Sequence, residues 1–166
     1  MRFARLLMLA LGFLAAGPAA ADVAPPAGAV VLTVSGRIDA GTSDVARFDM
    51  EMLRALPARE FTTSTIWTEG AHRFRGVPLA TLLDAVAADG TVLKATALND
   101  YSIEIPIADA VPEGPIIAYE FDGREMSVRE KGPLWIVYPF DADADYRTES
   151  VYSRSIWQLD RIEVVK

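Results

Sequence analysis

Residues 92–105 read VLKATALNDYSIEI, two runs of apolar and β-branched residues on either side of the polar pair Asn99-Asp100. Each run has the length and composition of a β-strand, which predicts strands at Val92–Leu98 and Tyr101–Ile105. Similar runs that follow predict further strands at Ile116–Phe121, Leu134–Tyr138 and Ile162–Val165. Asp122-Gly123 is typical of the tight turn of a β-hairpin. The second half of the chain is therefore predicted to be mostly sheet.

The first half of the chain combines strands with short helices. Strands are predicted at Ala29–Val34 and Phe61–Trp67, which are rich in β-branched and aromatic residues. Helical spacing predicts one helix through Phe48, Met52, Leu53 and Leu56, and a second that starts at Pro78 and carries Leu79, Leu82, Leu83 and Val86. The predicted fold class is α+β: a single mixed, sheet-rich domain with a few short helices.

Composition excludes several classes of function. The 166 residues are 51% hydrophobic and 23% charged, which predicts one globular domain and excludes a disordered chain. Acidic side chains outnumber basic ones 23 to 16, so a partner with a phosphate backbone, such as a nucleic acid, is not expected. The chain has no cysteine and one histidine, His72, which excludes disulfides, thiolate metal sites and histidine-rich zinc sites.

The N-terminus has the pattern of a secretory signal peptide. Arg2 and Arg5 precede an apolar run at residues 6–16, and Ala19-Ala20-Ala21 supplies a cleavage site. A membrane anchor is the alternative, but the run is short of the ~20 residues that a bilayer requires, and Gly17-Pro18 interrupts it. We expect a signal peptide at residues 1–21, a flexible leader at 22–28 and the folded domain at 29–166. The mature protein is expected to be periplasmic and not inserted in the membrane.

Several segments together resemble the molybdopterin-binding domain of the sulfite oxidase family, in its small periplasmic versions. They are Trp67-Thr68-Glu69-Gly70, Phe74-Arg75-Gly76-Val77-Pro78-Leu79, Leu98-Asn99-Asp100-Tyr101, Lys131-Gly132-Pro133-Leu134-Trp135 with Tyr138-Pro139, and Trp157-Gln158-Leu159. The resemblance spans residues 31–165. It implies a mixed α+β domain with a cofactor crevice lined by loops that follow the strands.

One departure from the family bears on the chemistry. Family members that hold molybdenum do so through a cysteine thiolate, often within C-x-E-G, and a match of Glu69-Gly70 to that motif places Trp67 at the cysteine position. Molybdenum favours a sulfur ligand, so a metal held by the protein is not expected. The chain is similar to a metal-free periplasmic subset that binds a reduced pterin. Some members of that subset report pterin occupancy to a membrane enzyme of cyclic di-GMP signalling. The expected partner is therefore the periplasmic domain of a membrane diguanylate cyclase or phosphodiesterase, or of a sensor kinase.

The residues predicted to bind the pterin lie in three segments of the chain. They are Trp67, Glu69, His72, Arg73, Arg75, Asn99, Asp100, Tyr101 and Lys131. Each also has a structural interpretation. Trp67 can stack on a pterin ring or cap the core, and Glu69 can accept hydrogen bonds from an aminopyrimidine edge or lie in a solvated turn.

The remaining candidates leave the same two interpretations open. Strand alternation predicts that His72 and Phe74 face one way while Arg73 and Arg75 face the other. A lone histidine is more often structural, and surface arginines are usually solvated. Asn99-Asp100-Tyr101 has turn chemistry as well as a position suited to binding. Lys131 can meet an anionic or carbonyl oxygen, and Trp157 and Leu159 are expected to be core.

Two further patterns have weak support. Asp141, Asp143 and Asp145 alternate with other residues as calcium ligands can, but the segment lacks the glycine and the glutamate that an EF-hand requires. We therefore expect a solvated acidic loop that is mobile until a ligand or partner orders it. No G-x-S-x-G motif surrounds the serines. Three hypotheses remain: a pterin-binding regulator, a molybdopterin-dependent oxidoreductase, and an interaction module that binds no ligand.

Overall fold

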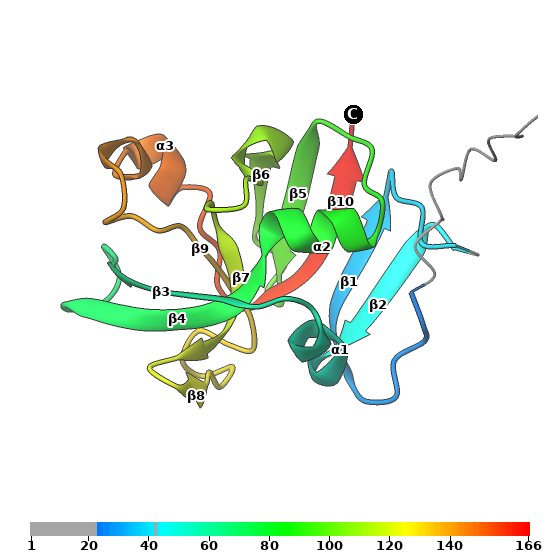
Figure 1. Ribbon diagram of the computed structural model, residues 1–166, viewed down its shortest axis with the longest axis horizontal. Helices are drawn as coiled ribbons and strands as arrows, with labels where there is room; N and C mark the ends of the chain where they lie inside the picture. Colours follow the sequence, from blue (N-terminus) through cyan, green and yellow to red (C-terminus); the bar gives the residue numbers. More distant parts are fainter. Residues whose placement is uncertain (1–22, 42) are drawn as a thin grey trace, which may run out of the picture.

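The computed structural model describes residues 23–41 and 43–166, so the predicted signal peptide lies outside the described residues. Two five-stranded sheets and a few short helices make up this part of the chain, which confirms the α+β class (Figure 1). No helix in the described part is long and apolar enough to cross a bilayer.

The first sheet is mixed and has the strand order β2-β1-β10-β5-β6. Its strands are β1 (Val30–Gly36), β2 (Val45–Asp49), β5 (Val92–Ala97), β6 (Ser102–Pro106) and β10 (Leu159–Val165). The last strand runs parallel to β1 and antiparallel to β5. This pairing brings the end of the chain to the centre of the sheet, and it places the residues just before β10 beside the β5–β6 loop.

The second sheet is antiparallel and is centred on β7. Its strands are β3 (Arg59–Ser64), β4 (Ala71–Pro78), β7 (Ile116–Phe121), β8 (Arg124–Glu125) and β9 (Trp135–Val137), which also pairs with β7. Asp122 and Gly123 have φ angles of 50° and 77° and form the predicted hairpin turn between β7 and β8. A two-residue hairpin turn of this kind requires positive φ at both central positions, and Asp and Gly both adopt positive φ readily.

The helices are α1 (Met50–Ala55), α2 (Leu79–Ala85) and α3 (Glu149–Tyr152), with 3-10 turns at Ile107–Asp109 and Ala144–Tyr146. The second predicted helix is confirmed, because α2 follows Pro78 and buries Leu79, Leu82 and Leu83. In the view of Figure 1, α2 lies near the centre of the molecule, in front of the first sheet, and α3 lies at the upper left, on the side where β3 and β4 project.

Two predicted elements have different limits in the structure. Phe48 belongs to strand β2 and pairs with Leu32, and the helix begins only at Met50 after Asp49, whose carboxylate accepts a hydrogen bond from Met52 N. The predicted strand 61–67 ends at Ser64. The next residues leave the sheet because the Thr65 hydroxyl accepts a hydrogen bond from Trp67 N and forms the local turn that presents Trp67.

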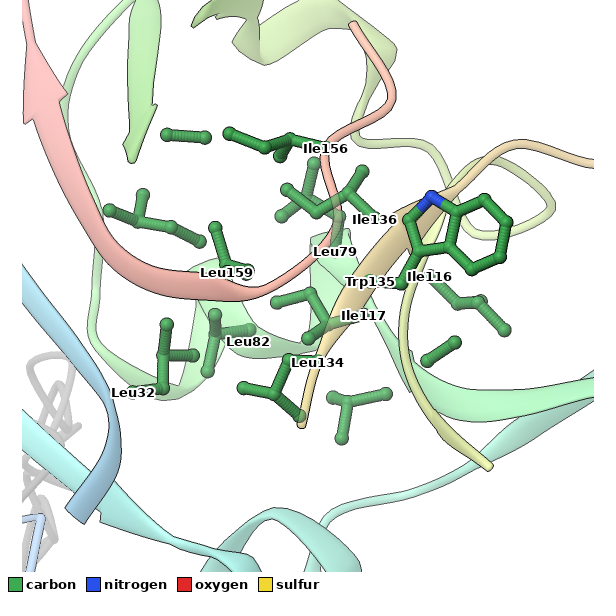
Figure 2. Close-up of a cluster of buried hydrophobic side chains, with 14 of the residues drawn as sticks. Leu32, Leu79, Leu82, Ile116, Ile117, Leu134, Trp135, Ile136, Ile156 and Leu159 are labelled. Carbon is green, nitrogen blue, oxygen red and sulfur yellow. The ribbon is translucent and has the colours of Figure 1, made fainter. Parts of the chain in front are cut away.

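One continuous core joins the two sheets. Figure 2 shows Leu79 and Leu82 of α2 gathered with side chains of β1, β7, β9 and the start of β10, and Trp135 beside them. Leu159 and Trp135 are fully buried, while Trp157 is only partly buried. The prediction that both Leu159 and Trp157 are core residues is therefore confirmed for Leu159 alone.

Candidate functional site

Trp67 lies at the centre of an aromatic cluster. Its ring centroid is 6.1 Å from those of Trp135 and Phe140, 6.0 Å from Tyr152 and 5.7 Å from Trp157. The rings meet at steep angles of 62° to 87°, an arrangement in which ring edges contact ring faces. Trp67 therefore packs against the core, and it also faces a pocket.

That pocket, here called the aromatic pocket, has a volume of about 460 Å³. It is lined by Ile66, Trp67, Ala97, Asn99, Tyr101, Glu149, Tyr152, Ser153, Ser155, Ile156, Trp157 and Gln158. The lining comes from the β3–β4 turn, the β5–β6 loop and the segment from α3 to β10. Aromatic walls with a few polar groups are typical of small-molecule sites.

Three of the nine predicted binding residues line this pocket: Trp67, Asn99 and Tyr101. Asn99 also serves the turn between β5 and β6, since its side-chain oxygen accepts a hydrogen bond from Tyr101 N at 3.2 Å. Asp100 sits at the apex of the turn with φ of 64° and pairs with Arg161 at 2.5 Å, outside the aromatic pocket. Asn99 therefore both stabilises the β5–β6 turn and lines the aromatic pocket.

Four predicted binding residues lie outside the aromatic pocket, on or beside β4: Glu69, His72, Arg73 and Arg75. His72 Nδ1 lies 2.8 Å from Asp122 Oδ2, and His72 Nε2 lies 2.8 Å from the carbonyl oxygen of Glu69. The hydrogen bond with Asp122 is the main cause that raises the pKa of His72.

The predicted alternation of side chains along β4 is confirmed, because His72 and Phe74 both pack on Phe121 while Arg73 and Arg75 are exposed. None of the four lines the aromatic pocket.

A second cavity, here called the hairpin pocket, lies beside the β7–β8 hairpin and has a volume of about 440 Å³. It is lined by Thr68, Phe121, Asp122, Arg124, Glu125, Met126, Glu130, Lys131 and Trp135. Lys131 is the predicted binding residue that lies here. Its Nζ is 4.3 Å from the ring centroid of Trp157 and 5.2 Å from that of Trp135. Partial burial lowers the pKa of the Lys131 ammonium group.

Several pocket residues were not predicted. Glu149, Tyr152 and Ser153 follow the aspartates that were interpreted as a solvated acidic loop, and no binding role was predicted for them or for Gln158. No local pattern identifies these residues, because their position depends on the pairing of β10 with β5. Beside that pairing, Leu98 N donates a hydrogen bond to the carbonyl oxygen of Gln158 at 2.9 Å.

The segment from Asp141 to Arg154, which begins with the acidic loop, is attached to the domain at both ends. Asp141 accepts hydrogen bonds from Ser64 N at 2.6 Å and from Ser64 Oγ at 2.7 Å. Near the other end, Arg154 pairs with Asp109 at 2.9 Å. Asp141 is therefore not a freely solvated carboxylate, because it anchors this segment to the end of β3.

The structure is an α+β domain with an aromatic pocket between loops at the strand ends. Residues 31–142, more than half of the chain, match the model of the oxidoreductase molybdopterin-binding domain, and the chain belongs to this family. A search of the curated proteins found no match. The matched region contains Trp67, Asn99 and Tyr101 and ends before α3, so the other wall of the aromatic pocket lies outside it.

The two parts of the family's cofactor fit this chain differently. A metal held by a thiolate does not fit, because the chain has no cysteine. Within residues 23–41 and 43–166, no group of three His, Asp or Glu side chains is placed to hold a metal ion either. The flat heterocyclic part does fit, since Trp67, Tyr152 and Trp157 supply aromatic surface to one pocket.

Proposed function

We propose that this protein binds a reduced pterin in the aromatic pocket without molybdenum held by the protein. The proposal places it in the periplasm, where it regulates a membrane diguanylate cyclase or phosphodiesterase, or a sensor kinase. The observation that carries the pterin proposal is the gathering of Trp67, Tyr152 and Trp157 around a pocket of about 460 Å³ in a domain of this family. The regulatory part rests on the resemblance to metal-free members of the family.

The pocket offers what a pterin requires. The aromatic rings provide surface for the bicyclic ring, and such contacts contribute about 0.5–1.5 kcal/mol beyond burial. The carboxylate of Glu149 and the amide oxygen of Gln158 can accept hydrogen bonds from the N–H groups of an aminopyrimidine edge. Asn99 adds an amide that can donate to a ring carbonyl. These residues bind and orient the ligand, and the aromatic walls exclude water from its faces.

Titration of the purified protein with tetrahydrobiopterin under reducing conditions tests binding. Trp67→Ala is expected to weaken binding by about 1–3 kcal/mol, or roughly 5- to 150-fold, because both stacking and apolar contact are lost. Arg75→Gln is the matched control, because Arg75 was a predicted site residue and lies outside the pocket. Asn99→Ala, at an exposed position, provides a second variant if Trp67→Ala unfolds. Equal affinities in the folded variants would contradict the proposal.

The regulatory role has its own test. Pterin-free and pterin-loaded protein are compared for affinity toward the isolated periplasmic domain of the membrane partner, and a roughly 5- to 150-fold difference is expected. Equal affinities would leave a pterin-binding protein and remove the regulatory role.

Family membership keeps an oxidoreductase as the competing function. Elemental analysis of protein purified from the periplasm decides between the two. Stoichiometric molybdenum would overturn the metal-free proposal.

A further inference from the structure

The hairpin pocket has an apolar floor and a charged rim. Phe121, Met126 and Trp135 form the floor, and Met126 and Trp135 are almost completely buried. The rim carries three carboxylates, Asp122, Glu125 and Glu130, and two cations, Arg124 and Lys131. Which of these charges already has a partner decides what the pocket can bind.

The three carboxylates are all engaged within the protein. Asp122 accepts a hydrogen bond from Arg73 N at 3.0 Å and lies 2.8 Å from His72 Nδ1. Glu125 pairs with Arg54 at 2.5 Å. One oxygen of Glu130 accepts hydrogen bonds from the backbone N–H and the hydroxyl of Ser127, both at 3.1 Å. These contacts point the acidic groups of the rim toward protein donors.

The two cations have no such partners. Within the described part of the chain, neither Arg124 nor Lys131 takes part in an ion pair or a side-chain hydrogen bond. The ammonium group of Lys131 lies over the rings of Trp157 and Trp135. Cation–π contact offsets part of the desolvation of the ammonium and provides no hydrogen-bond acceptor. The N–H donors of both side chains thus remain available to a ligand.

We infer that the hairpin pocket is a second binding site, separate from the aromatic pocket, for a small organic anion with a flat apolar body. The carboxylate or phosphate of the ligand pairs with Lys131 and Arg124, and its apolar body lies against Phe121, Met126 and Trp135. Charge-assisted hydrogen bonds of this kind are about twice as strong as neutral ones, which predicts discrimination between an anion and a neutral molecule of the same shape.

Calorimetric titration with benzoate and with benzamide, its neutral isostere, tests the charge requirement. Benzoate is expected to bind at least tenfold more tightly than benzamide. Lys131→Met and Arg124→Gln are each expected to weaken benzoate binding at least fivefold. Arg129→Gln is the matched control, because Arg129 is an exposed cation of the same loop that does not line the pocket. It is expected to stay within twofold of the wild type. Arg124 is exposed, so its variant remains informative if Lys131→Met fails to fold.

Competition separates this site from the pterin site. Benzoate is expected to bind with similar affinity to the Trp67→Ala protein and to protein saturated with tetrahydrobiopterin. If the pterin displaces benzoate, the anion shares the pterin site and the inference is overturned. Equal binding of benzoate and benzamide, or unchanged binding in both cation variants, overturns it as well. If benzoate binds while the pterin does not, the proposed function fails and the anion site stands.

Discussion

His72 is the residue whose protonation the structure ties most directly to stability. Its two ring nitrogens contact the Asp122 carboxylate and the Glu69 carbonyl oxygen, so the doubly protonated ring can donate to both. These contacts raise the pKa of His72 above its ordinary value of 6.5. The sequence predicted that His72 binds a pterin, and in the structure its side chain links β4 to the β7–β8 turn through Asp122.

The first prediction is a pH dependence of stability. The pKa of His72 is raised in the folded state, so its contribution is fully present below about pH 6.5 and is lost as pH rises through the folded-state pKa. Urea unfolding at pH 5.5 and pH 8.5 is expected to show a lower free energy of unfolding at the higher pH. His72→Gln is expected to reduce that difference.

The pKa of Asp122 is lowered, chiefly by the hydrogen bond from Arg73 N, so its contribution is lost only in acid. The stability that Asp122 contributes is therefore lost at a lower pH than the stability that His72 contributes, so the two effects can be measured separately. An unchanged pH difference in the His72→Gln protein would remove His72 as its source.

At the scale of single elements, β4 and β7 approach each other closely where Gly76 pairs with Ala118. A Cβ atom at Gly76 would lie 2.0 Å from the carbonyl oxygen of Ile117, a contact that only a shift of backbone can relieve. The Phe-Arg-Gly-Val-Pro segment therefore contains a glycine that the sheet requires, and Pro78 follows it as the first boundary of α2.

We expect Gly76→Ala to destabilise the protein by about 3 kcal/mol or more, since the added Cβ on β4 would clash with the backbone of β7. Gly70→Ala is the control, because a Cβ there meets nothing within 4 Å and only the positive φ of 76° opposes it. Its expected cost is about 1–2 kcal/mol. Denaturant midpoints measure both. Similar losses in the two variants would contradict the assigned cause.

The segment from Asp141 to Arg154 is the element that carries α3 to the aromatic pocket. Its attachments are the Asp141 carboxylate on Ser64 and the Arg154 guanidinium on Asp109. Tyr138 OH also donates to Asp109 at 2.7 Å, and burial is the main cause that raises the pKa of this phenol. The wall of the pocket that contains Tyr152 therefore depends on contacts remote from the pocket.

Arg154→Gln is expected to lower stability by about 1–2 kcal/mol, since a partly buried carboxylate loses a charged partner. It is also expected to weaken pterin binding, because Tyr152 is less firmly held. Arg147→Gln, in the same segment and exposed, is the control for charge. Thermal unfolding and pterin titration measure the two effects, and pterin affinity equal to that of the wild type would show that the attachment does not support the pocket.

The whole molecule combines an acidic surface with a predicted export signal. Loss of Arg2 and Arg5 with the signal peptide leaves 14 of the 16 basic side chains against all 23 acidic ones. We expect N-terminal sequencing of protein from the periplasmic fraction to begin at Asp22. Protein that retains Met1 and fractionates with the cytoplasm would contradict the predicted export.

The sequence alone determined the fold class and the order of most elements. Periodicity located α2 and the strands after residue 92, because local patterns of apolar residues decide which face of an element is buried. It missed β2, because residues 45–49 form a strand only through pairing with β1, and Phe48 fits a helical pattern equally well. The absence of cysteine, also visible in the sequence, excluded a metal held by a thiolate.

Only the tertiary structure decided which candidate residues share a pocket. It placed Trp67, Asn99 and Tyr101 together, and it placed Lys131 in the hairpin pocket and His72 against Asp122. The physical reason is that the other wall of the aromatic pocket is formed by Tyr152, Trp157 and Gln158, which are all more than fifty positions away from Asn99 and Tyr101 in the sequence. The antiparallel pairing of β10 with β5 brings them there, and a pattern within either segment does not show which distant strand it will pair with.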